Sequence, residues 1–309
     1  MPKVLLTGYS GFVGSQLMMT LKPKFDLSLI GRTAPDDKTI PFNQCSIDKR
    51  SNYSQAVADV DVVIHCAARA HIMDDDSADP LIEFRKVNTL GTLNLAKQAA
   101  DAGVKRFIYI SSIKVNGESS EENKPFKYDD KHALKDPYGV SKGEAEIALL
   151  ELGQQSGMEI VIIRPPLVYG EGVKANFAAL LKLVLKGLPL PFRCIKHNTR
   201  SMVSVYNLVD LIKTCIEHPN AANQVFLVSD DDDLSTAQMI ALMAKVQGKR
   251  NLALPVPVWC FKLVGKLLNK QDVVDRLTGS LQVDIEHTKK TLNWQPPYSV
   301  EHGFKLAAK

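Results

Sequence analysis

The sequence predicts an α/β fold in which a parallel sheet is covered by helices on both faces. Apolar runs such as KVLLTG and VKRFIYISS are continuous rather than alternating, which is typical of strands buried on both faces. Segments of helical length separate these runs, as the crossovers between parallel strands require. This rhythm covers residues 1–170, so we expect one large domain there.

Strands and helices follow one another in a regular order along this first domain. Pro23 closes the first helix, because proline cannot continue a helix, and Gly157 ends the longest one. The predicted elements are a strand at 3–8, a helix at 14–22, a strand at 25–32, a short helix running into a strand within 55–68, a helix at 88–103, a strand at 104–112, a helix at 137–157 and a strand at 158–166.

The pattern changes in the second half, where helices dominate and strands are short. Helices are predicted at 177–187 and 236–248, and short strands at 201–205 and 224–229. We therefore expect a smaller mixed α/β region over residues 171–309, which caps the sheet and returns some segments to the sheet of the first domain.

Composition and charge exclude several classes of function. The 309 residues carry a net charge of +4 and no run of five or more basic residues, so nucleic acid is not an expected partner. The five cysteines are widely spaced without a C-x-x-C pair, which predicts neither disulfides nor zinc and favours a reducing, cytoplasmic setting. The aspartate runs at 74–76 and 230–233 lack regular ligand spacing, so no metal is expected.

The apolar segments are too short to cross a membrane. None approaches the ~20 residues that span a bilayer, and the first strand begins too early to leave room for a signal peptide. The most apolar helical segment is VPVWCFKLVGKLL at 256–268. Lys262 and Lys266 interrupt it, which favours a core-facing or lid helix over membrane contact, and we expect no membrane insertion.

A glycine-rich turn follows the first strand. Gly8, Gly11 and Gly14 form the pattern G-x-x-G-x-x-G directly before the first helix. Glycine lets the backbone turn sharply and approach a pyrophosphate, while the helix N-terminus offers free N–H groups and the positive end of its dipole. The turn therefore predicts a dinucleotide site.

Arg32 ends the second strand, where an acidic residue would bind the adenosine ribose and select NAD. An arginine at this position can accommodate a 2′-phosphate instead, and the hydroxyls of Ser10 and Thr33 are candidate donors to the same group. The alternative is an arginine that is only solvated. We expect a preference for NADP(H), with NAD as the alternative cofactor.

Hydroxyl and ammonium groups meet at the carboxyl edge of the predicted sheet, where ligands of parallel sheets bind. Ser111 and Ser112 end the strand RFIYISS, and Tyr138 begins the next helix with Lys142 one turn further on the same face. An adjacent ammonium and a positive nicotinamide ring both favour the phenolate, which lowers the pKa of a tyrosine. Tyr138 is therefore a candidate general acid/base.

Together these motifs resemble the extended short-chain dehydrogenase/reductase family, in its nucleotide-sugar branch of epimerases, dehydratases and ketoreductases. HCAARAH, VNTLGTLNL and ISSIKVNG resemble further family motifs, so the resemblance covers nearly the whole chain. It implies a Rossmann fold, that is, a doubly wound parallel sheet, and it makes Ser112 the catalytic hydroxyl beside Tyr138 and Lys142. The implied cofactor contacts, besides the glycines and the catalytic pair, are Phe12, Val13, Ile47, Ala67, Ala68, Asn88 and Pro165.

The resemblance also implies residues that bind the nucleotide sugar. Asn176 stands where relatives have an asparagine near the diphosphate, and TRSMVSVYNLVDL resembles a motif whose arginine, here Arg200, contacts a nucleotide phosphate. A structural salt bridge is the alternative role for Arg200. Arg276 is a further candidate for the nucleotide. His71 could reach the rim of the site, whereas His65 and Asn88 also suit purely structural roles.

Three departures from the family pattern bear on the reaction. Ser46 replaces an aspartate that contacts adenine in relatives, and Asn207 replaces an aspartate of the arginine motif. Ile113 and Lys114 stand where sugar 4,6-dehydratases have an Asp–Glu pair that removes water. A dehydratase is therefore not expected.

The expected reaction is hydride transfer at a sugar carbon, with Tyr138 exchanging the proton. Arg32 favours an NADP(H)-dependent reductase that acts on the C4 keto group of a UDP-sugar. The alternative is a UDP-hexose 4-epimerase with tightly bound NAD, and the alternative of another class is a non-catalytic dinucleotide-sensing protein. The helices over 88–102 and 138–152 resemble those that pair in family dimers, so we expect a homodimer.

Overall fold

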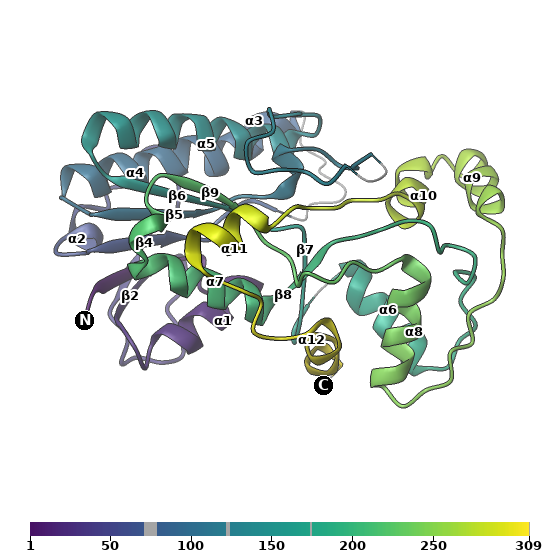
Figure 1. Cartoon of the computed structure of the whole chain (residues 1–309). Helices are drawn as coiled ribbons and strands as arrows, with labels where there is room; N and C mark the ends of the chain where they lie inside the picture. The colour runs from purple at the N-terminus through teal and green to yellow at the C-terminus, as the bar shows by residue number, and fades with distance from the viewer. Residues whose placement is uncertain (71–78, 122–123, 174, 309) are drawn as a thin grey trace.

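The protein is built on a seven-stranded, all-parallel sheet in the order β3-β2-β1-β4-β5-β6-β9, shown in Figure 1. The computed structural model describes residues 1–70, 79–121, 124–173 and 175–308. The strands of this sheet are β1 (Lys3–Thr7), β2 (Asp26–Gly31), β3 (Phe42–Gln44), β4 (Val62–His65), β5 (Arg106–Ile110), β6 (Glu159–Arg164) and β9 (Gln224–Leu227).

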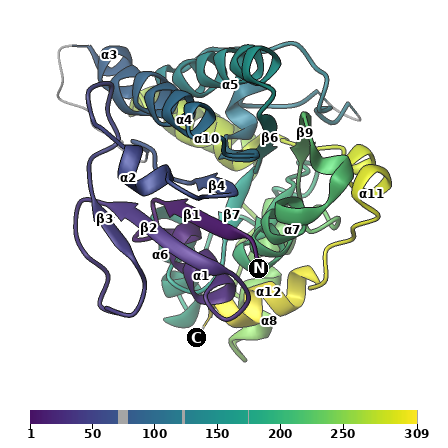
Figure 2. The same ribbon diagram turned by 90° about the vertical axis from the view of Figure 1, so that its left-hand side faces the viewer.

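Helices cover both faces of the sheet, which confirms the doubly wound fold (Figure 2). One face is covered by α1 (Phe12–Leu21), α7 (Val205–Glu217) and α11 (Glu286–Leu292). The other is covered by α2 (Ser54–Val57), α4 (Thr92–Asp101) and α5 (Pro137–Ser156). Alternate side chains of each strand enter opposite cores, so Val4 and Leu6 pack with α1 while Leu5 packs with α4.

A smaller second core lies beyond the carboxyl edge of the sheet. The short strands β7 (Leu167–Tyr169) and β8 (Met202–Ser204) pair in parallel there. The helices of this part are α6 (Ala175–Leu185), α8 (Thr236–Val246), α9 (Val258–Leu267), α10 (Gln271–Thr278) and α12 (Val300–Ala307). Tyr169, Phe177 and Phe304 form an aromatic cluster that joins β7, α6 and α12. None of the helices over the described ranges is long and apolar enough to cross a membrane.

Short irregular elements complete the fold. These are the helix α3 (Pro80–Arg85), the π-helix η1 (Lys86–Gly91) and the 3-10 helices η2 (Ile113–Val115) and η3 (Pro219–Ala221). The sequence predicted one helix over 88–103, whereas η1 occupies its first turn and α4 begins only at Thr92. The edge strand β3 was not predicted, because its residues Phe42–Gln44 are too few to show a pattern.

The segment 256–268 was expected to form a core-facing or lid helix, and only one side of helix α9 faces the core, where Val258 and Phe261 pack. Helix α9 packs on α10, but Trp259 is 65% exposed and Leu267 is 76% exposed. The apolar residues of this segment are therefore divided between one side that meets the core and another that is exposed.

Candidate active site

The glycine turn connects β1 to α1 at the point where the strand order reverses between β1 and β4. Gly8 has φ +71°, and a Cβ there would lie 2.5 Å from the backbone nitrogen of Ala67. A Cβ on Gly14 would lie 2.1 Å from the carbonyl oxygen of Gly8, so neither position accepts a side chain. Gly11 begins α1, and no side chain caps the helix there. The first N–H groups of α1 are thus open to an anion.

The remaining residues predicted around this turn lie at the start of α1 and after β2. Phe12 and Val13 occupy the first turn of α1 and pack their side chains against the core, while Ser10 is exposed. Arg32 and Thr33 follow β2 and are also exposed. The Tyr9 hydroxyl donates to the carbonyl oxygen of Thr33, which ties the two loops together.

Lys142 lies below the carboxyl end of β5. Its Nζ donates a hydrogen bond of 2.8 Å to the carbonyl oxygen of Ile110 and lies 4.5 Å from the centre of the Tyr109 ring. The side chain is buried, and burial lowers the pKa of Lys142 to about 8, although Cys66 and Glu146 act in the opposite direction. The ammonium form therefore still predominates near neutral pH.

Tyr138 stands at the N-terminus of α5. Asp136 caps this helix by accepting hydrogen bonds from the backbone nitrogens of Tyr138 and Gly139, and Pro137 occupies the first turn. The half-buried phenol lies edge-on to Phe84 at 5.9 Å. Burial raises the pKa of Tyr138, and the charge of Asp136 raises it further. The sequence predicted that the Lys142 ammonium and a nicotinamide ring lower this pKa, but in the chain alone burial and Asp136 raise it.

The two serines after β5 have different surroundings. Ser111 is buried, and its hydroxyl has no hydrogen-bond partner of good geometry among the described residues. Ser112 is half-buried, and its Oγ only accepts a long hydrogen bond of 3.3 Å from the backbone nitrogen of Lys114. The Ser112 hydroxyl hydrogen is therefore available to a substrate oxygen.

Asn88 lies in η1, and its side-chain amide is fully engaged within the chain. It accepts a hydrogen bond from the Arg69 backbone and donates to the Arg69 carbonyl oxygen and to the Ser141 hydroxyl. No amide hydrogen is left for a dinucleotide, so Asn88 holds the segment after β4 against α5. A π-turn at such a position is typical of functional sites.

His65 has the structural role that the sequence allowed. Its ring nitrogens contact the hydroxyls of Thr7 at 2.7 Å and Thr92 at 2.9 Å, and its ring stacks on Tyr109. Burial and then the charge of Lys142 lower the pKa of His65 to about 3. A neutral His65 thus joins the ends of β1 and β4 to α4.

A buried ion pair under the site was missed by sequence reasoning. Arg164 ends β6, and its Nη2 contacts the Glu146 carboxylate of α5 at 2.6 Å and His132 at 2.9 Å, while its Nη1 donates to the Asn116 side chain. Burial opposes the ionised form of Glu146, but His132 and Arg164 lower its pKa below the usual value. The network fixes α5, and so Tyr138, relative to the strand ends. The helical spacing of Glu146 after Lys142 was the only sequence signal.

Arg200 and Arg276 lie together in the second part of the protein. Backbone bridges to Leu234 and Leu281 fix Arg200, and its Nη1 donates to the carbonyl oxygen of Arg276 at 2.9 Å. Burial lowers the pKa of Arg200, and the charge of Arg276 lowers it further. Neither arginine forms an ion pair with a carboxylate of the described residues. Two unneutralised guanidinium groups in one place suit a diphosphate.

The other predicted residues take the following places. The backbone N–H of Ala67 donates a hydrogen bond to Thr7 Oγ1, and the carbonyl oxygen of Pro165 accepts one from the backbone N–H of Ile113. Ile47 packs in the core below α4. Ala68 follows β4 and is half-buried. Asn176 lies in the first turn of α6, and His71 lies outside the described residues.

The side chains present fit a nicotinamide dinucleotide. The glycine turn has no room for side chains of its own, the start of α1 has no cap, and Lys142 lies at the inner end of the same strand edge. Tyr138 at the start of α5 and Ser112 in the loop after β5 supply two hydroxyls at the carboxyl edge of the sheet. This arrangement can exchange a proton with a substrate oxygen beside a hydride carrier.

Comparison with known proteins agrees with this geometry. The chain is 56% identical over 312 residues to a UDP-glucose 4-epimerase of Vibrio cholerae, covering 100% of this chain and 95% of the relative. It is 29% identical over 319 residues to an N-acetyl-alpha-D-glucosaminyl-diphospho-ditrans,octacis-undecaprenol 4-epimerase of Escherichia coli O157:H7, covering 97% and 92%.

Solved structures show the same fold. A UDP-glucose 4-epimerase of Thermus thermophilus in complex with NAD superimposes with a TM-score of 0.78 at 21% identity, over 99% of this chain and 97% of that one. The model of the NAD dependent epimerase/dehydratase family matches residues 4–229, which hold the glycine turn, both serines and the Tyr138–Lys142 pair. The chain is therefore an enzyme that belongs to the NAD dependent epimerase/dehydratase family.

Proposed function

We propose that this enzyme is a UDP-sugar 4-epimerase that retains NAD between turnovers. The observation that carries the proposal is the 56% identity, over the full chain, to a relative named UDP-glucose 4-epimerase. The reductase that the sequence favoured rested on Arg32 and on the resemblance of the C-terminal half to reductases of UDP-4-keto sugars. That side chain is exposed, and the comparisons give no support to a preference for NADP(H).

Each residue of the site has a part in this reaction. NAD, which the glycine turn and the start of α1 would hold, would supply reversible hydride transfer at C4 of the sugar. Tyr138 takes the proton of the 4-hydroxyl and later gives it back, while Ser112 donates a hydrogen bond to the same oxygen. Lys142 supplies a positive charge on the inner side of the strand edge, where it favours the ionised phenol.

The second part of the protein supplies the hold on the nucleotide. Arg200 and Arg276 would bind the diphosphate, which leaves the sugar itself free to turn and present either face. A diphosphate between the two guanidinium groups also relieves their mutual repulsion. The binding energy then comes from the part of the substrate that does not react.

A second candidate substrate carries the same diphosphate on a lipid. The relative of Escherichia coli O157:H7 is named for a sugar joined through a diphosphate to undecaprenol, and α9 exposes apolar side chains beside the helix that holds Arg276. The chemistry at C4 would be unchanged. We therefore include a polyprenyl-diphosphate sugar in the test below.

We also propose a homodimer through α4 and α5. Ile147 on α5 and Leu90 before α4 are exposed in the single chain and could contact a second copy. Light scattering at micromolar concentration tests this pairing. A monomeric mass contradicts it without affecting the proposed reaction.

The reaction is tested with desalted enzyme and no added cofactor. We expect interconversion of UDP-glucose with UDP-galactose, or of their N-acetyl forms or the lipid-linked sugar, and release of NAD on denaturation. A reductase would instead consume added NADPH with a 4-keto sugar and would not interconvert the hexoses.

The cofactor is tested separately at Arg32. Dissociation constants for NAD and NADP are measured by fluorescence titration in wild type and in Arg32→Asp. The epimerase proposal expects wild type to bind NAD at least as tightly as NADP. A preference for NADP of about 10-fold or more that is lost in the variant is the result expected of a 2′-phosphate contact, and it contradicts the proposal.

A further inference from the structure

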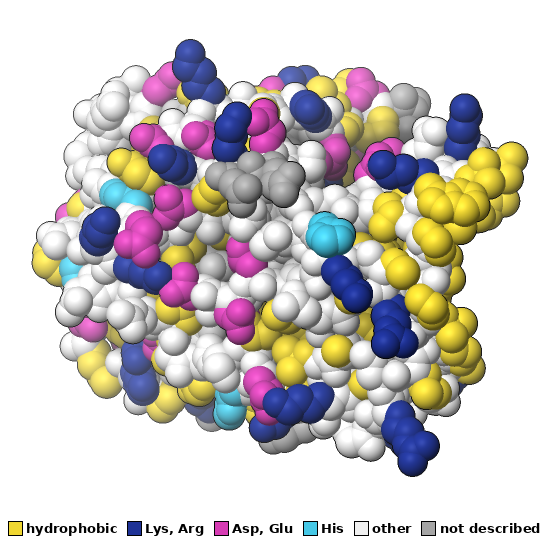
Figure 3. Space-filling view, turned by 45° about the vertical axis from the view of Figure 1, so that its right-hand side comes forward, with side chains coloured by type: hydrophobic (Ala, Val, Ile, Leu, Met, Phe, Trp, Pro, Cys, Tyr) yellow, Lys and Arg dark blue, Asp and Glu magenta, His cyan; other side chains and the backbone are white. Residues whose placement is uncertain are grey.

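Exposed apolar side chains concentrate at one end of the molecule. Among the described residues, seventeen large apolar side chains are exposed, and ten of them lie between Leu185 and Val273. Figure 3 shows them gathered on the side that Figure 1 draws at the right, with lysine and arginine side chains beside them. Single exposed apolar residues are ordinary on a protein surface, but a contiguous group of this size marks an interaction site.

Helix α9 is the centre of this group. Its inner side is formed by Phe261, which stacks on Phe192, and by Gly265, which is buried against Val274 of α10. Its outer side carries Trp259 and Leu267, at 65% and 76% exposure. We call the outer side the α9 face, and its members are Trp259, Lys262, Leu263, Lys266, Leu267 and Leu268.

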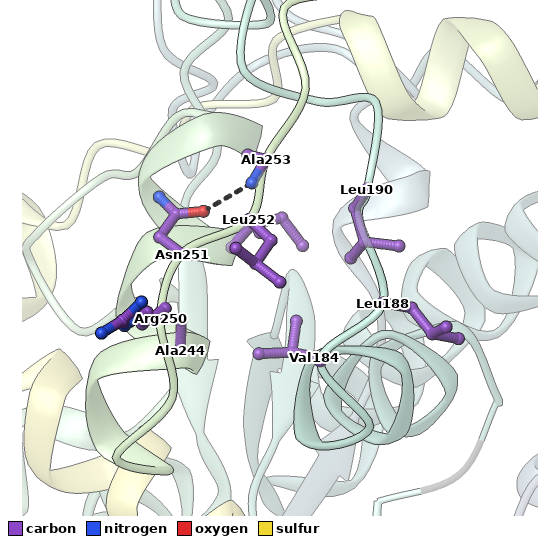
Figure 4. A pocket seen from close by; sticks show the side chains of 10 residues that line it. Val184, Leu188, Leu190, Ala244, Arg250, Asn251, Leu252 and Ala253 are labelled. Atoms are coloured by element: carbon purple, nitrogen blue, oxygen red, sulfur yellow. Dashed lines mark hydrogen bonds between the residues drawn. The ribbon is translucent and has the colours of Figure 1, made fainter.

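The loop before α9 extends the α9 face towards α6. Leu252 and Leu188 line a small hollow that is edged by Arg250, as Figure 4 shows. The loop is held by backbone hydrogen bonds that join Leu254 to Leu190 and Arg193. The apolar surface therefore continues from α9 onto a fixed part of the fold, next to further basic side chains.

Charge is distributed unevenly between this end and the rest of the chain. Residues 172–209 and 234–271 contain twelve of the 38 basic residues and none of the 34 acidic ones. The remainder has 26 basic against 34 acidic residues, which gives it a net charge of −8 although the whole chain carries +4. The nearest acids to the α9 face in sequence are Asp272 and Asp275 on α10. An occupant of the α9 face is therefore expected to be both apolar and negatively charged.

We propose that the α9 face docks on the surface of an anionic lipid bilayer. Helix α9 has ten residues, so its length of ~15 Å is half of the ~30 Å hydrocarbon core, and it lies along the interface rather than across it. Leucine and tryptophan side chains enter the boundary of headgroups and acyl chains, while Lys262 and Lys266 meet lipid phosphates. Tryptophan is enriched at that depth of a membrane.

Docking would bring the substrate-binding part to the membrane. Helix α10 packs on α9 and carries Arg276, whose carbonyl oxygen accepts a hydrogen bond from Arg200. The seven-stranded sheet belongs to the other part of the molecule and would remain in water. This inference concerns surface binding and does not depend on which sugar the enzyme converts.

The test uses the full chain and large unilamellar vesicles. Phosphatidylcholine vesicles with phosphatidylglycerol are compared with pure phosphatidylcholine, by cosedimentation and by tryptophan fluorescence. The chain has two tryptophans, and Trp294 is buried with its indole nitrogen bonded to Asp210. A change in emission therefore reports Trp259. We expect cosedimentation and a blue shift with the anionic vesicles and little of either with the neutral ones.

Two double variants separate the charged and apolar contributions. Lys262→Glu with Lys266→Glu should lower the partition coefficient on anionic vesicles about 10-fold or more. Leu263→Gln with Leu267→Gln should lower it similarly and abolish the blue shift. The control replaces two exposed lysines of the first domain, Lys49→Glu with Lys97→Glu, and should bind vesicles as wild type does. Circular dichroism and UDP binding confirm that each variant is folded.

Two outcomes overturn the proposal. One is absence of binding to the anionic vesicles, or binding that none of the α9 variants changes. The other is a dimer in light scattering that Leu263→Gln with Leu267→Gln converts to a monomer while vesicles do not bind, which would make the α9 face a contact between copies of this chain.

Discussion

Asp136 accepts a hydrogen bond of 3.1 Å from the backbone nitrogen of Tyr138, so the residue that caps α5 also places a negative charge next to the proposed acid/base. Burial is the larger cause of the raised pKa of Tyr138, and the charge of Asp136 raises this pKa further. Lys114 lies 3.3 Å from the same carboxylate and partly offsets it. Lys114 thus places a cation where dehydratases have an acid. Its charge counteracts that of Asp136 beside the Tyr138 phenol.

Asp136→Asn should move the rise of kcat with pH to lower pH. Asparagine keeps the cap of α5 but removes the charge that raises the pKa of Tyr138, so the phenolate forms more readily. The pH–rate profile of epimerisation measures the shift. Asp79→Asn, at the N-cap of α3, is the matched control and should leave the profile unchanged. A shift to higher pH in Asp136→Asn would contradict the proposed coupling.

Tyr138→Phe should lower kcat by at least ~100-fold while NAD and UDP still bind, because only the proton exchange is removed. Turnover is followed with the hexose pair, and binding by calorimetry. The exposed Tyr298 provides a control, since Tyr298→Phe should retain full activity. Near-normal turnover in Tyr138→Phe would end the assignment of Tyr138 as acid/base.

Much of the site could be predicted because its chemistry is local in sequence. The glycine turn, the serines after a strand and the Tyr138–Lys142 spacing each lie within one short segment. The start of α5 at Pro137 and its end before Gly157, which has φ +78°, were also predicted from single residues with strong conformational preferences.

Features that depend on distant partners could not be predicted. Arg164 and Glu146 are 18 residues apart on different elements, and only the packing of α5 on β6 brings them together. Asn88 looked like a cofactor contact because nothing in the sequence reveals that Arg69 and Ser141 use its whole amide. For α9, periodicity identified an apolar helix but not which of its sides meets the core.

His65 should make the protein sensitive to acid. Its pKa is about 3 in the folded chain and about 6.5 when unfolded, so between these values only the unfolded chain takes up the proton. The free energy of unfolding should therefore fall as pH drops from 6.5 towards 3, by roughly 5 kcal/mol in total from this residue. Urea unfolding across this range measures the slope.

His65→Gln should have a shallower slope than wild type over the same pH range, because glutamine cannot take up a proton. His197→Gln, at an exposed position, should keep the wild-type slope and serves as the control. Equal slopes in wild type and His65→Gln would show that the ring is not held neutral by burial.

Arg276→Gln should weaken UDP binding about 10- to 100-fold without lowering stability. A charge-assisted hydrogen bond to phosphate contributes roughly 1.5–3 kcal/mol, so its loss raises the dissociation constant measured by calorimetry. Removal of this charge also relieves the repulsion that lowers the pKa of Arg200, so the free energy of unfolding should be unchanged or higher. A structural salt bridge would give the opposite result, with lower stability and unchanged UDP affinity. Arg50→Gln, at an exposed position of the first domain, should change neither quantity.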